Sequence, residues 1–410
     1  MDLTNLRDHH EELINHMKDF GYSMSCIYIY KHQIREILEL DIDSWTSYKD
    51  IYQYFERVSS NKKDLKWRRS VIGGIEYFDL HHLFPDRRRI CSFIEPRGAY
   101  YSLNLEYQLL IDHYKFHAEK AGKSKETTID NESHSGATFL YHLQQQGCSN
   151  LETVIEHDVL SYFLDGSGAL IRTAGCCKNV RAVLKAGLEI NKSACKRVLL
   201  FLPCLTEHRK NIQVLTDEEV EKIKQLLKSD CLSMRDNAIL YLLLYTGLRG
   251  IDIVNLTLQS IDWNRDCIRL VQSKTKAELE LPLLPSVGNA LYDYILNERP
   301  NCDYQTIFIS EVVPYEPLKV QTIHWIVRKA FKLAKIRMNK SDRIGTHLFR
   351  HNITSKLLEN DTALPVISNI LGHTSPRSVE PYLHTDFLHL KECALSIEEF
   401  PMRQEVLDID

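Results

Sequence analysis

Residues 346–384, which read THLFRHNITSKLLENDTALPVISNILGHTSPRSVEPYLH, constrain this chain more than any other stretch. His347 and Arg350 are three residues apart, so a helix places both side chains on one face. The run PVISNIL followed by glycine predicts a helix that stops just before His373. Tyr382 follows nine residues later. An arginine, two histidines and a tyrosine so close together suit the attack of a nucleophile on an anionic group.

The composition is that of an ordinary globular protein with more than one domain. The chain has 410 residues, of which 44% are hydrophobic and 26% charged, and this length predicts two or three domains. The first residues are charged and lack the apolar segment of a secretory signal, and no run approaches the roughly 18 apolar residues that span a bilayer. The eleven cysteines are an odd number without CxxC spacing, which favours reduced thiols over disulfides or structural zinc. These features predict a cytoplasmic protein.

The first half of the chain predicts two helical domains, at residues 1–95 and 100–205. Apolar residues recur at helical spacing through 10–20 and 27–40, and a further helix is expected to begin near Ser47. Two short motifs recur within this half, LINH as LIDH and IYQYF as VLSYF, at residues 13–16, 110–113, 51–55 and 159–163. Each copy of the first motif is expected to open a helical stretch. The recurrence is typical of related domains, although coincidence between two generic helical bundles also explains it.

Basic residues follow the second motif in each copy and are candidates for contact with DNA phosphates. They lie in NKKDLKWRRS, around Trp67, and in a second helix that follows VLSYF. The ordinary explanation of such a run is a solvated helix face, and the net charge of −4 argues mildly against a nucleic-acid binder. The candidate DNA-binding residues are Lys62, Lys66, Arg68, Arg69, Arg172, Lys178 and Arg181.

A new domain is predicted to begin after a linker in the middle of the chain. Thr216 and Glu219 have the spacing of a capping box before an apolar-periodic helix. The stretch DNAILYLLLYTGLRGIDIVNL predicts a buried helix that ends near Gly247, with Arg249 at the start of the next helix. Asp252 comes three residues later, where its carboxylate can cap that helix or hold the Arg249 guanidinium.

Alternating residues then predict an antiparallel hairpin. CIRLVQ and ELELPLL alternate like strands and are joined by SKTKA, so Lys274 is expected at the edge of the hairpin. TIFIS, at residues 306–310, is a candidate for a further strand. Residues 319–335 predict a basic helix.

Together these motifs resemble the catalytic domain of the tyrosine recombinase (phage integrase) family. The resemblance covers residues 212–390 and rests on TGLRGIDIVNL, SKTKAELELPL, HLFR, LGH and the tyrosine that follows, which agree in order and spacing. Residues 100–205 resemble, less closely, the helical SAM-like core-binding domain that precedes it in the family. Each residue alone has an ordinary explanation, such as a packing ring for the tyrosine, but these explanations would all have to hold independently. The resemblance assigns six catalytic residues: Arg249, Lys274, His347, Arg350, His373 and Tyr382.

The six side chains suit the transfer of a phosphodiester. The transition state gathers negative charge on the non-bridging oxygens, to which Arg249 and Arg350 can each donate two hydrogen bonds while they stay charged. The two histidines can add donors, and one of them can take the phenol proton. The tyrosine is then the nucleophile, and the hairpin lysine protonates the leaving 5′-oxygen. In the family, a 5′-hydroxyl of a partner duplex reverses the covalent 3′-phosphotyrosine, so the resemblance implies no metal, ATP or other cofactor.

Two positions depart from the pattern of the family. Pro381 directly precedes the tyrosine, where a non-proline is more common, and it biases Glu380 away from helix, so Tyr382 is expected to emerge from a break. Asp252 stands, as a supporting residue, where many members have glutamate. Neither change removes a catalytic group, which favours an active enzyme.

The expected fold is multidomain and mainly α-helical. Helical N-terminal and core-binding domains at 1–95 and 100–205 precede a mixed α/β catalytic domain with a small antiparallel sheet at 212–395, and a tail follows at 396–410. The first domain is expected to bind separate arm sites on DNA or to extend the clamp that the helical and catalytic domains form around duplex DNA. In the family the tail passes in trans between four subunits. A short apolar helix that suits this role is predicted from Phe387, Leu388, Leu390, Ala394 and Leu395.

The resemblance implies a site-specific DNA recombinase or integrase encoded by a bacterium, a phage or a mobile element. Its expected partners are double-stranded DNA, three further copies of the chain on synapsed DNA, and accessory DNA-bending or directionality proteins, with no membrane. One alternative is a type IB topoisomerase-like enzyme that relaxes DNA, but two helical domains ahead of the catalytic domain favour site recognition. The other alternative is a non-catalytic DNA-binding regulator, which needs no tyrosine nucleophile.

Overall fold

A computed structural model describes most of the chain. The described residues are 2–40, 45–59, 61–85, 93, 98–122, 125–205, 212–339, 342–372 and 382, without the side chains of 62 and 63. They divide into two units, which are described separately. The first unit comprises Met1, Ile42–Gly73 and Ile90–Lys210, and the second comprises Asp2–Asp41, Gly74–Arg89 and Asn211–Asp410.

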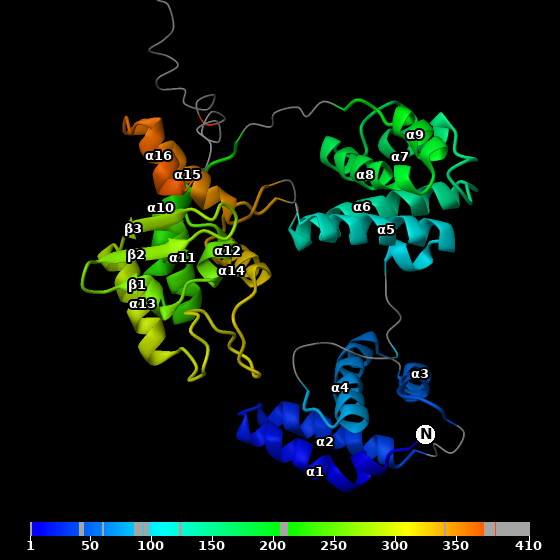
Figure 1. Ribbon diagram of the computed structural model, residues 1–410. Coiled ribbons are helices and arrows are strands. Elements are labelled where there is room, and N and C mark those ends of the chain that lie inside the picture. Colours follow the sequence, from blue (N-terminus) through cyan, green and yellow to red (C-terminus); the bar gives the residue numbers. More distant parts are fainter. Residues whose placement is uncertain are drawn as a thin grey trace, which may run out of the picture. The chain divides into compact units, whose positions relative to one another are not determined.

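The first unit is helical throughout its described part (Figure 1). It contains α3 (Tyr48–Val58), the start of α4 (Lys62–His81), η1 (Ala99–Ser102), α5 (Leu105–Ala121), α6 (Glu126–Gln145), α7 (Glu156–Phe163), α8 (Ala174–Ala186), η2 (Gly187–Glu189) and α9 (Lys192–Phe201). The predicted helix start near Ser47 is confirmed, because Ser47 forms a capping box with Asp50 at the start of α3.

Helix α6 packs against both α5 and α8 and carries much of the core of this unit (Figure 1). The aromatic rings of Tyr107, Phe139 and Phe163 are almost completely buried there. Gly136 permits the close approach of α6 and α8, since a Cβ atom at this position would lie 2.8 Å from Cγ2 of Val183. Burial of this apolar surface is the main force that holds such helices together.

The second unit begins with α1 (Thr4–Asp19) and α2 (Met24–Leu38), which pack together, and includes the end of α4. The Asn5 side chain donates hydrogen bonds to the carbonyls of Phe78 and Asp79, at 3.1 and 3.0 Å. The Asp79 carboxylate accepts from the Leu6 backbone N–H at 2.7 Å, which satisfies an N–H at the start of α1. The recurring motif LINH does not open a helix as expected, because Leu13 lies in the second half of α1.

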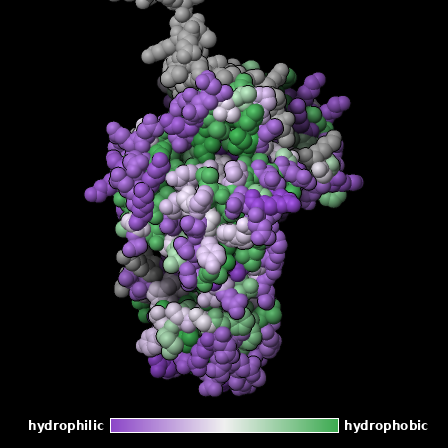
Figure 2. Space-filling model, turned by 90° about the vertical axis from the view of Figure 1, so that its left-hand side faces the viewer, coloured by the Kyte–Doolittle hydropathy of each residue, from purple (hydrophilic) through white to green (hydrophobic). Residues whose placement is uncertain are grey.

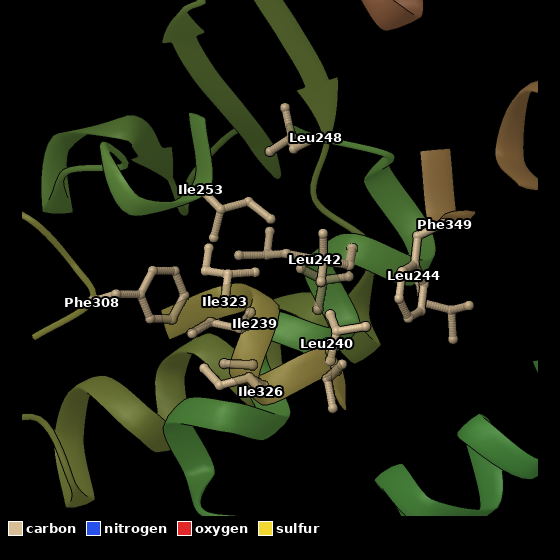
Figure 3. Packing of buried hydrophobic residues seen from close by; sticks show 14 of the residues in the cluster. Ile239, Leu240, Leu242, Leu244, Leu248, Ile253, Phe308, Ile323, Ile326 and Phe349 are labelled. Carbon is tan, nitrogen blue, oxygen red and sulfur yellow. The ribbon is translucent and has the colours of Figure 1, made fainter. Parts of the chain in front are cut away.

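The rest of the second unit is a mixed α/β fold built around one buried helix (Figure 1). Its elements are α10 (Asp217–Leu227), α11 (Met234–Thr246), α12 (Gly250–Val254), η3 (Leu258–Ser260), β1 (Ile261–Asp262), β2 (Cys267–Val271), β3 (Glu278–Pro282), α13 (Pro285–Asn297), α14 (Val320–Leu333), α15 (His347–Glu359) and α16 (Leu364–Leu371). Helix α11 is buried on nearly every side, and Figure 3 shows residues of α11, α14 and α15 meeting in this core.

Local signals of the sequence account for the ends of these elements. The capping box before α10 is confirmed: the Thr216 hydroxyl accepts from the Glu219 N–H at 3.2 Å, and the Glu219 carboxylate accepts from the Thr216 N–H at 3.0 Å. Gly247 ends α11 with a φ of +62°, and Gly372 ends α16 with a φ of +60°. Glycine adopts this left-handed conformation at little steric cost. The predicted helix stop before His373 is therefore confirmed.

The small sheet is antiparallel with the strand order β1-β2-β3. The predicted hairpin is confirmed, with Cys267 opposite Pro282 and Val271 opposite Glu278. The further strand expected at 306–310 is wrong, because Thr306 and Ile309 form only isolated bridges, to Thr257 and Pro317. Ile307, Phe308 and Ile309 are nevertheless completely buried, so the apolar run reflects burial rather than pairing in a sheet.

Hydrophilic side chains cover much of the face shown in Figure 2, with apolar side chains between them. Within the described part of the chain, none of the helices combines the length and the apolar character that crossing a bilayer requires. The nine cysteines that the structure describes are all free thiols, as predicted for this part of the chain.

Candidate active site

The site is built from the ends of four helices and the β2–β3 hairpin, and Arg249 enters it from the start of α12. The left-handed Gly247 turns the chain sharply after α11, and Arg249 occupies the N-cap position of the next helix. Its side chain is largely buried. Its Nη1 atom donates a hydrogen bond to Oε1 of Gln272 at 2.6 Å and lies 4.0 Å from Oδ2 of Asp252. The guanidinium is thus held in place before any ligand arrives.

Arg350, on α15, is buried more deeply, with 5% of the residue exposed. Its Nη1 donates to the Gly247 carbonyl at 3.1 Å, and its Nη2 donates to the Leu371 carbonyl at 2.6 Å. These bonds fix one guanidinium against the carboxyl ends of α11 and α16. Burial and the nearby charge of Arg249 lower the pKa of Arg350 to about 10, so this group still carries its charge at neutral pH.

Gln272, which the sequence motifs did not single out, connects these parts of the site. It is completely buried, donates through Nε2 to the Leu371 carbonyl at 3.0 Å, and accepts through Oε1 from Arg249 and from the Thr275 hydroxyl. A Cβ atom at Gly372 would lie 2.5 Å from this side chain. Glycine is therefore required here both for its conformation and for the approach of Gln272. The sequence gives no signal for this role, because the burial of Gln272 becomes apparent only in the fold.

The hairpin turn that carries Lys274 is attached to α12 by Asp252. The Ser273 backbone N–H donates to Oδ1 of the Asp252 carboxylate at 2.8 Å, while Oδ2 faces Arg249. Asp252 therefore lies within α12 and supports both groups, so the alternative that it caps the helix is wrong. Lys274 is exposed, and its charge contributes to lowering the pKa of His347, which brings the lysine to the same site.

His347 opens α15, where the sequence predicts it to share a helix face with Arg350. Burial lowers the pKa of His347, as do the charges of Arg350 and Arg249. One turn later, His351 lies on the same side, with its ring 6.0 Å from that of His347. The sequence does not single out His351, although a histidine four residues after His347 and directly after Arg350 was a signal in the helix periodicity.

Tyr382 is 5% exposed and packs in a small cluster with Leu358, Ile367 and Leu371. Its hydroxyl lies 2.6 Å from Nδ1 of His351. Burial raises the pKa of the Tyr382 phenol, opposed by a hydrogen bond with Thr354 and by the charges of Arg350 and Arg249. Burial also lowers the pKa of His351, to about 4, with help from neighbouring positive charge. At neutral pH the phenol is protonated and the imidazole is neutral, so the phenol can donate to Nδ1 in the tautomer that carries its proton on Nε2.

The structure thus brings Arg249, Arg350, His347, Lys274 and Tyr382 together. His373 and Pro381 lie outside the described residues. The break that Pro381 predicts before Tyr382 stays a prediction, because the residues on both sides of the tyrosine are not described.

The candidate DNA-binding residues lie elsewhere, in the first unit. Lys66 is exposed on α4 and Lys178 is exposed on α8, whereas Arg69 and Arg181 are half-buried. The Arg68 guanidinium lies over the rings of Phe55 and Trp67, at 4.6 and 4.9 Å from their centroids, and that of Arg172 lies 4.9 Å from the Tyr162 ring. The two arginines therefore have packing roles within this unit. The side chain of Lys62 is not described.

Comparison with known proteins finds a family model that matches the second half of the chain, and relatives that match part of the chain. The model of the phage integrase family matches residues 213–389. An inferred integrase/recombinase of Sinorhizobium fredii, y4gC, is 35% identical over 164 residues, which are 40% of this chain and 83% of the relative. The tyrosine recombinase XerC of Proteus mirabilis is 28% identical over 182 residues, which are 44% of this chain and 56% of XerC.

Solved structures share the fold. The XerH site-specific recombinase, in a post-cleavage complex with its palindromic difH substrate, has a TM-score of 0.54 and 15% identity over 84% of this chain and 93% of XerH. A lambda integrase dimer bound to a core site has a TM-score of 0.50 and 20% identity over 67% of this chain and 76% of the integrase chain. At these identities the likeness concerns the fold alone.

Proposed function

Because the chain belongs to the phage integrase family, we propose that it is a site-specific DNA recombinase that cleaves and rejoins strands through a covalent 3′-phosphotyrosine at Tyr382. The observation that carries this proposal is the 2.6 Å contact between the Tyr382 hydroxyl and Nδ1 of His351. A buried phenol within hydrogen-bond distance of a neutral imidazole, beside two arginines, is the arrangement that a tyrosine nucleophile requires.

The arginines would hold the scissile phosphate. A guanidinium has five N–H groups, and the two carbonyls of Gly247 and Leu371 accept from two of those of Arg350. The remaining N–H groups of Arg350 and those of Arg249 would donate to the non-bridging oxygens. These oxygens gain negative charge in the transition state, and donors that are already oriented stabilise that charge without reorganisation.

The nucleophile would lose its proton to His351. The sequence suggested His347 or His373 for this step, but the hydrogen bond of Tyr382 favours His351. As the phenol oxygen bonds to phosphorus, its affinity for a proton falls, and the proton passes to Nδ1. The bond between phosphorus and the 5′-oxygen breaks at the same time, and Lys274 would supply the proton that makes this oxygen a hydroxyl.

The reverse sequence of steps would rejoin the strands. A 5′-hydroxyl from a partner duplex attacks the phosphotyrosine, its proton passes to Lys274, and His351 returns a proton to the tyrosine. The number of phosphoester bonds is unchanged at every stage, so neither hydrolysis nor an external energy source is required. Double-stranded DNA is the proposed substrate, and four copies of the chain on two duplexes form the proposed assembly.

A plasmid assay distinguishes this function from the two alternatives. The DNA that borders the gene is searched for inverted repeats, and two copies of the candidate site are placed in one supercoiled plasmid. The proposed recombinase deletes or inverts the segment between them. A topoisomerase-like enzyme relaxes plasmids with or without the sites, and a regulator binds the sites but changes neither topology nor sequence. Either of those results contradicts the proposal.

A further inference from the structure

Two histidines and a glutamate converge in the first unit, whereas the candidate active site belongs to the second unit. His113 and His117 are four residues apart on α5, so their side chains share one face of the helix. Glu189 approaches that face from η2. Its Oε2 atom lies 3.4 Å from Nε2 of His113 and 3.4 Å from Nε2 of His117, and the three ligand atoms lie within 4.8 Å of one another.

Backbone packing holds η2 close to α5. A Cβ atom at Gly187 would lie 2.5 Å from Cδ1 of Leu110 and 2.8 Å from Sγ of Cys195, so a larger residue would require these side chains to move. Leu110 precedes His113 by three residues and shares its helix face. The contact that places Gly187 against Leu110 therefore also places Glu189 near the two imidazoles. Leu110 and Cys195 belong to the packed core of this unit.

The donor set suits a divalent transition-metal ion. Imidazole nitrogen and carboxylate oxygen are ordinary ligands of zinc, and two histidines four apart on a helix are a frequent way to supply them. Zinc bonds of about 2.0–2.1 Å in a tetrahedron separate neighbouring ligand atoms by roughly 3.3–3.4 Å, which agrees with the separations at Glu189. The Nε2 atom of His113 is buried and makes no hydrogen bond within the described structure.

The solvent exposure of the three side chains also suits the binding of an ion. The side chain of His113 is 22% exposed, that of His117 is 41% exposed and that of Glu189 is 64% exposed. One side of the cluster therefore faces solvent, so an ion can enter and a water molecule can complete its coordination.

We propose that His113, His117 and Glu189 bind a zinc-like divalent ion that ties η2 to α5. The sequence predicts no metal site, because Glu189 is far from the histidine pair along the chain and only the fold brings it there. The site is separate from Tyr382 and its proposed chemistry, and the inference does not depend on the proposed function. The other explanation of the same distances is an ion pair between Glu189 and protonated imidazoles, without a metal.

Titration of the full-length chain with Co²⁺ and then Zn²⁺ distinguishes these explanations. Co²⁺ bound by two imidazoles and a carboxylate gives visible absorption without the near-ultraviolet charge-transfer bands of thiolate ligands, so binding by the free cysteines is recognised separately. The double variant His113→Gln, His117→Gln should lose this spectrum, and Glu189→Gln should weaken Zn²⁺ binding about tenfold or more. His157→Gln is the matched control, because His157 is exposed in the same unit.

Hydrogen exchange of the wild-type chain provides a readout that needs no variant. Bound Zn²⁺ should slow amide exchange in residues 105–121 and 187–190 relative to the metal-free protein, with little change in α16. The double variant should show no such slowing while its circular dichroism stays that of the wild type. The proposal is wrong if Zn²⁺ leaves exchange in α5 unchanged, or if the double variant binds Co²⁺ with the wild-type spectrum and stoichiometry.

Discussion

At the scale of single residues, the geometry of Arg350 explains why an arginine is needed there. One guanidinium donates to two carbonyls, of Gly247 and Leu371, that belong to different helix ends. A lysine ammonium is a point charge on a flexible stem and cannot reproduce this fork while it also faces a phosphate. The residue therefore combines a structural contact with a proposed electrostatic role.

We predict that Arg350→Lys slows single-turnover cleavage by about 10²-fold or more, because lysine keeps the positive charge but lacks the oriented N–H donors of the guanidinium. Rates are measured at saturating DNA, so that weaker binding does not contribute. Arg265→Lys, at an exposed turn, is the control and should cleave at the wild-type rate. Full activity in Arg350→Lys would contradict the role of the fork.

His351 gives the second prediction at this scale. Burial and neighbouring positive charge lower its pKa from 6.5 to about 4, so the neutral, proton-accepting form predominates above that pH. The cleavage rate should be nearly constant from pH 8 to about pH 5.5 and should fall toward pH 4 as the imidazole is protonated. A base with an ordinary histidine pKa would instead lose activity from about pH 6.5 downward.

The variant His351→Gln tests whether protonation of His351 causes the fall of the cleavage rate toward pH 4. Glutamine can still accept a hydrogen bond from the phenol but cannot take its proton, so cleavage should slow by roughly 10²–10⁴-fold. The remaining activity should no longer depend on pH between 4 and 6. If the cleavage rate of this variant still fell toward pH 4 as in the wild type, another group would take the proton.

At the scale of elements, the sequence predicts what local signals determine. The capping box at Thr216, the left-handed Gly247 and Gly372, and the hairpin around Lys274 each depend on a few neighbouring residues, and the structure confirms them. The strand expected at 306–310 fails because pairing partners, unlike burial, are chosen by distant parts of the chain. The strand β1 pairs with the neighbouring β2 and is missed for another reason, because two residues are too few to show an alternating pattern.

The same distinction explains the residues missed in the candidate site. Gln272 contacts Leu371, and His351 contacts Tyr382, across long separations in sequence. Neither residue belongs to the spaced motifs from which the six catalytic positions are predicted. Such contacts arise only when α15, α16 and the hairpin pack together, so a sequence pattern read along the chain does not contain them.

Helix α4 carries a prediction about affinity. If Lys66 and Arg69 contact phosphates, the variants Lys66→Gln and Arg69→Gln should each reduce the salt slope of DNA binding by roughly 0.9, because fewer counterions are released. Arg68 is left intact, since its guanidinium packs over Phe55 and Trp67. Binding is measured between low and moderate salt, with the exposed Lys228→Gln as the control. An unchanged slope would indicate that these residues form only a solvated helix face and do not contact DNA.

At the scale of the whole molecule, the net charge of −4 is a sum over all charged residues and does not describe how charge is distributed on the surface. Binding to DNA depends on the local distribution of charge, and an acidic total is compatible with basic faces turned toward phosphate. Assembly into a complex of several subunits is a separate question. The apolar segment after Tyr382 suggests a contact between subunits. The helix predicted there lies outside the described residues.

Deletion of residues 386–410 should therefore leave a protein that binds its site but does not form a complex of four subunits on two duplexes. The apolar residues of this segment, from Phe387 to Leu395, require a covering surface, which a neighbouring subunit would supply. Sedimentation of protein–DNA complexes measures the assembly, and the plasmid assay measures recombination. Tetramers formed by the truncated protein would show that the segment is not needed in trans.

The central claim is that Tyr382 is the nucleophile, and a suicide substrate tests it most directly. A nick beside the cleavage position releases the 5′-hydroxyl fragment, so rejoining is blocked and the covalent complex accumulates. After digestion, mass spectrometry of the wild-type protein should locate the DNA phosphate on Tyr382. Tyr382→Phe, which removes one hydroxyl and keeps the packed ring, should bind the same DNA and form no adduct, while the control Tyr315→Phe reacts normally. An adduct on another residue, or one that persists in Tyr382→Phe, would contradict the claim.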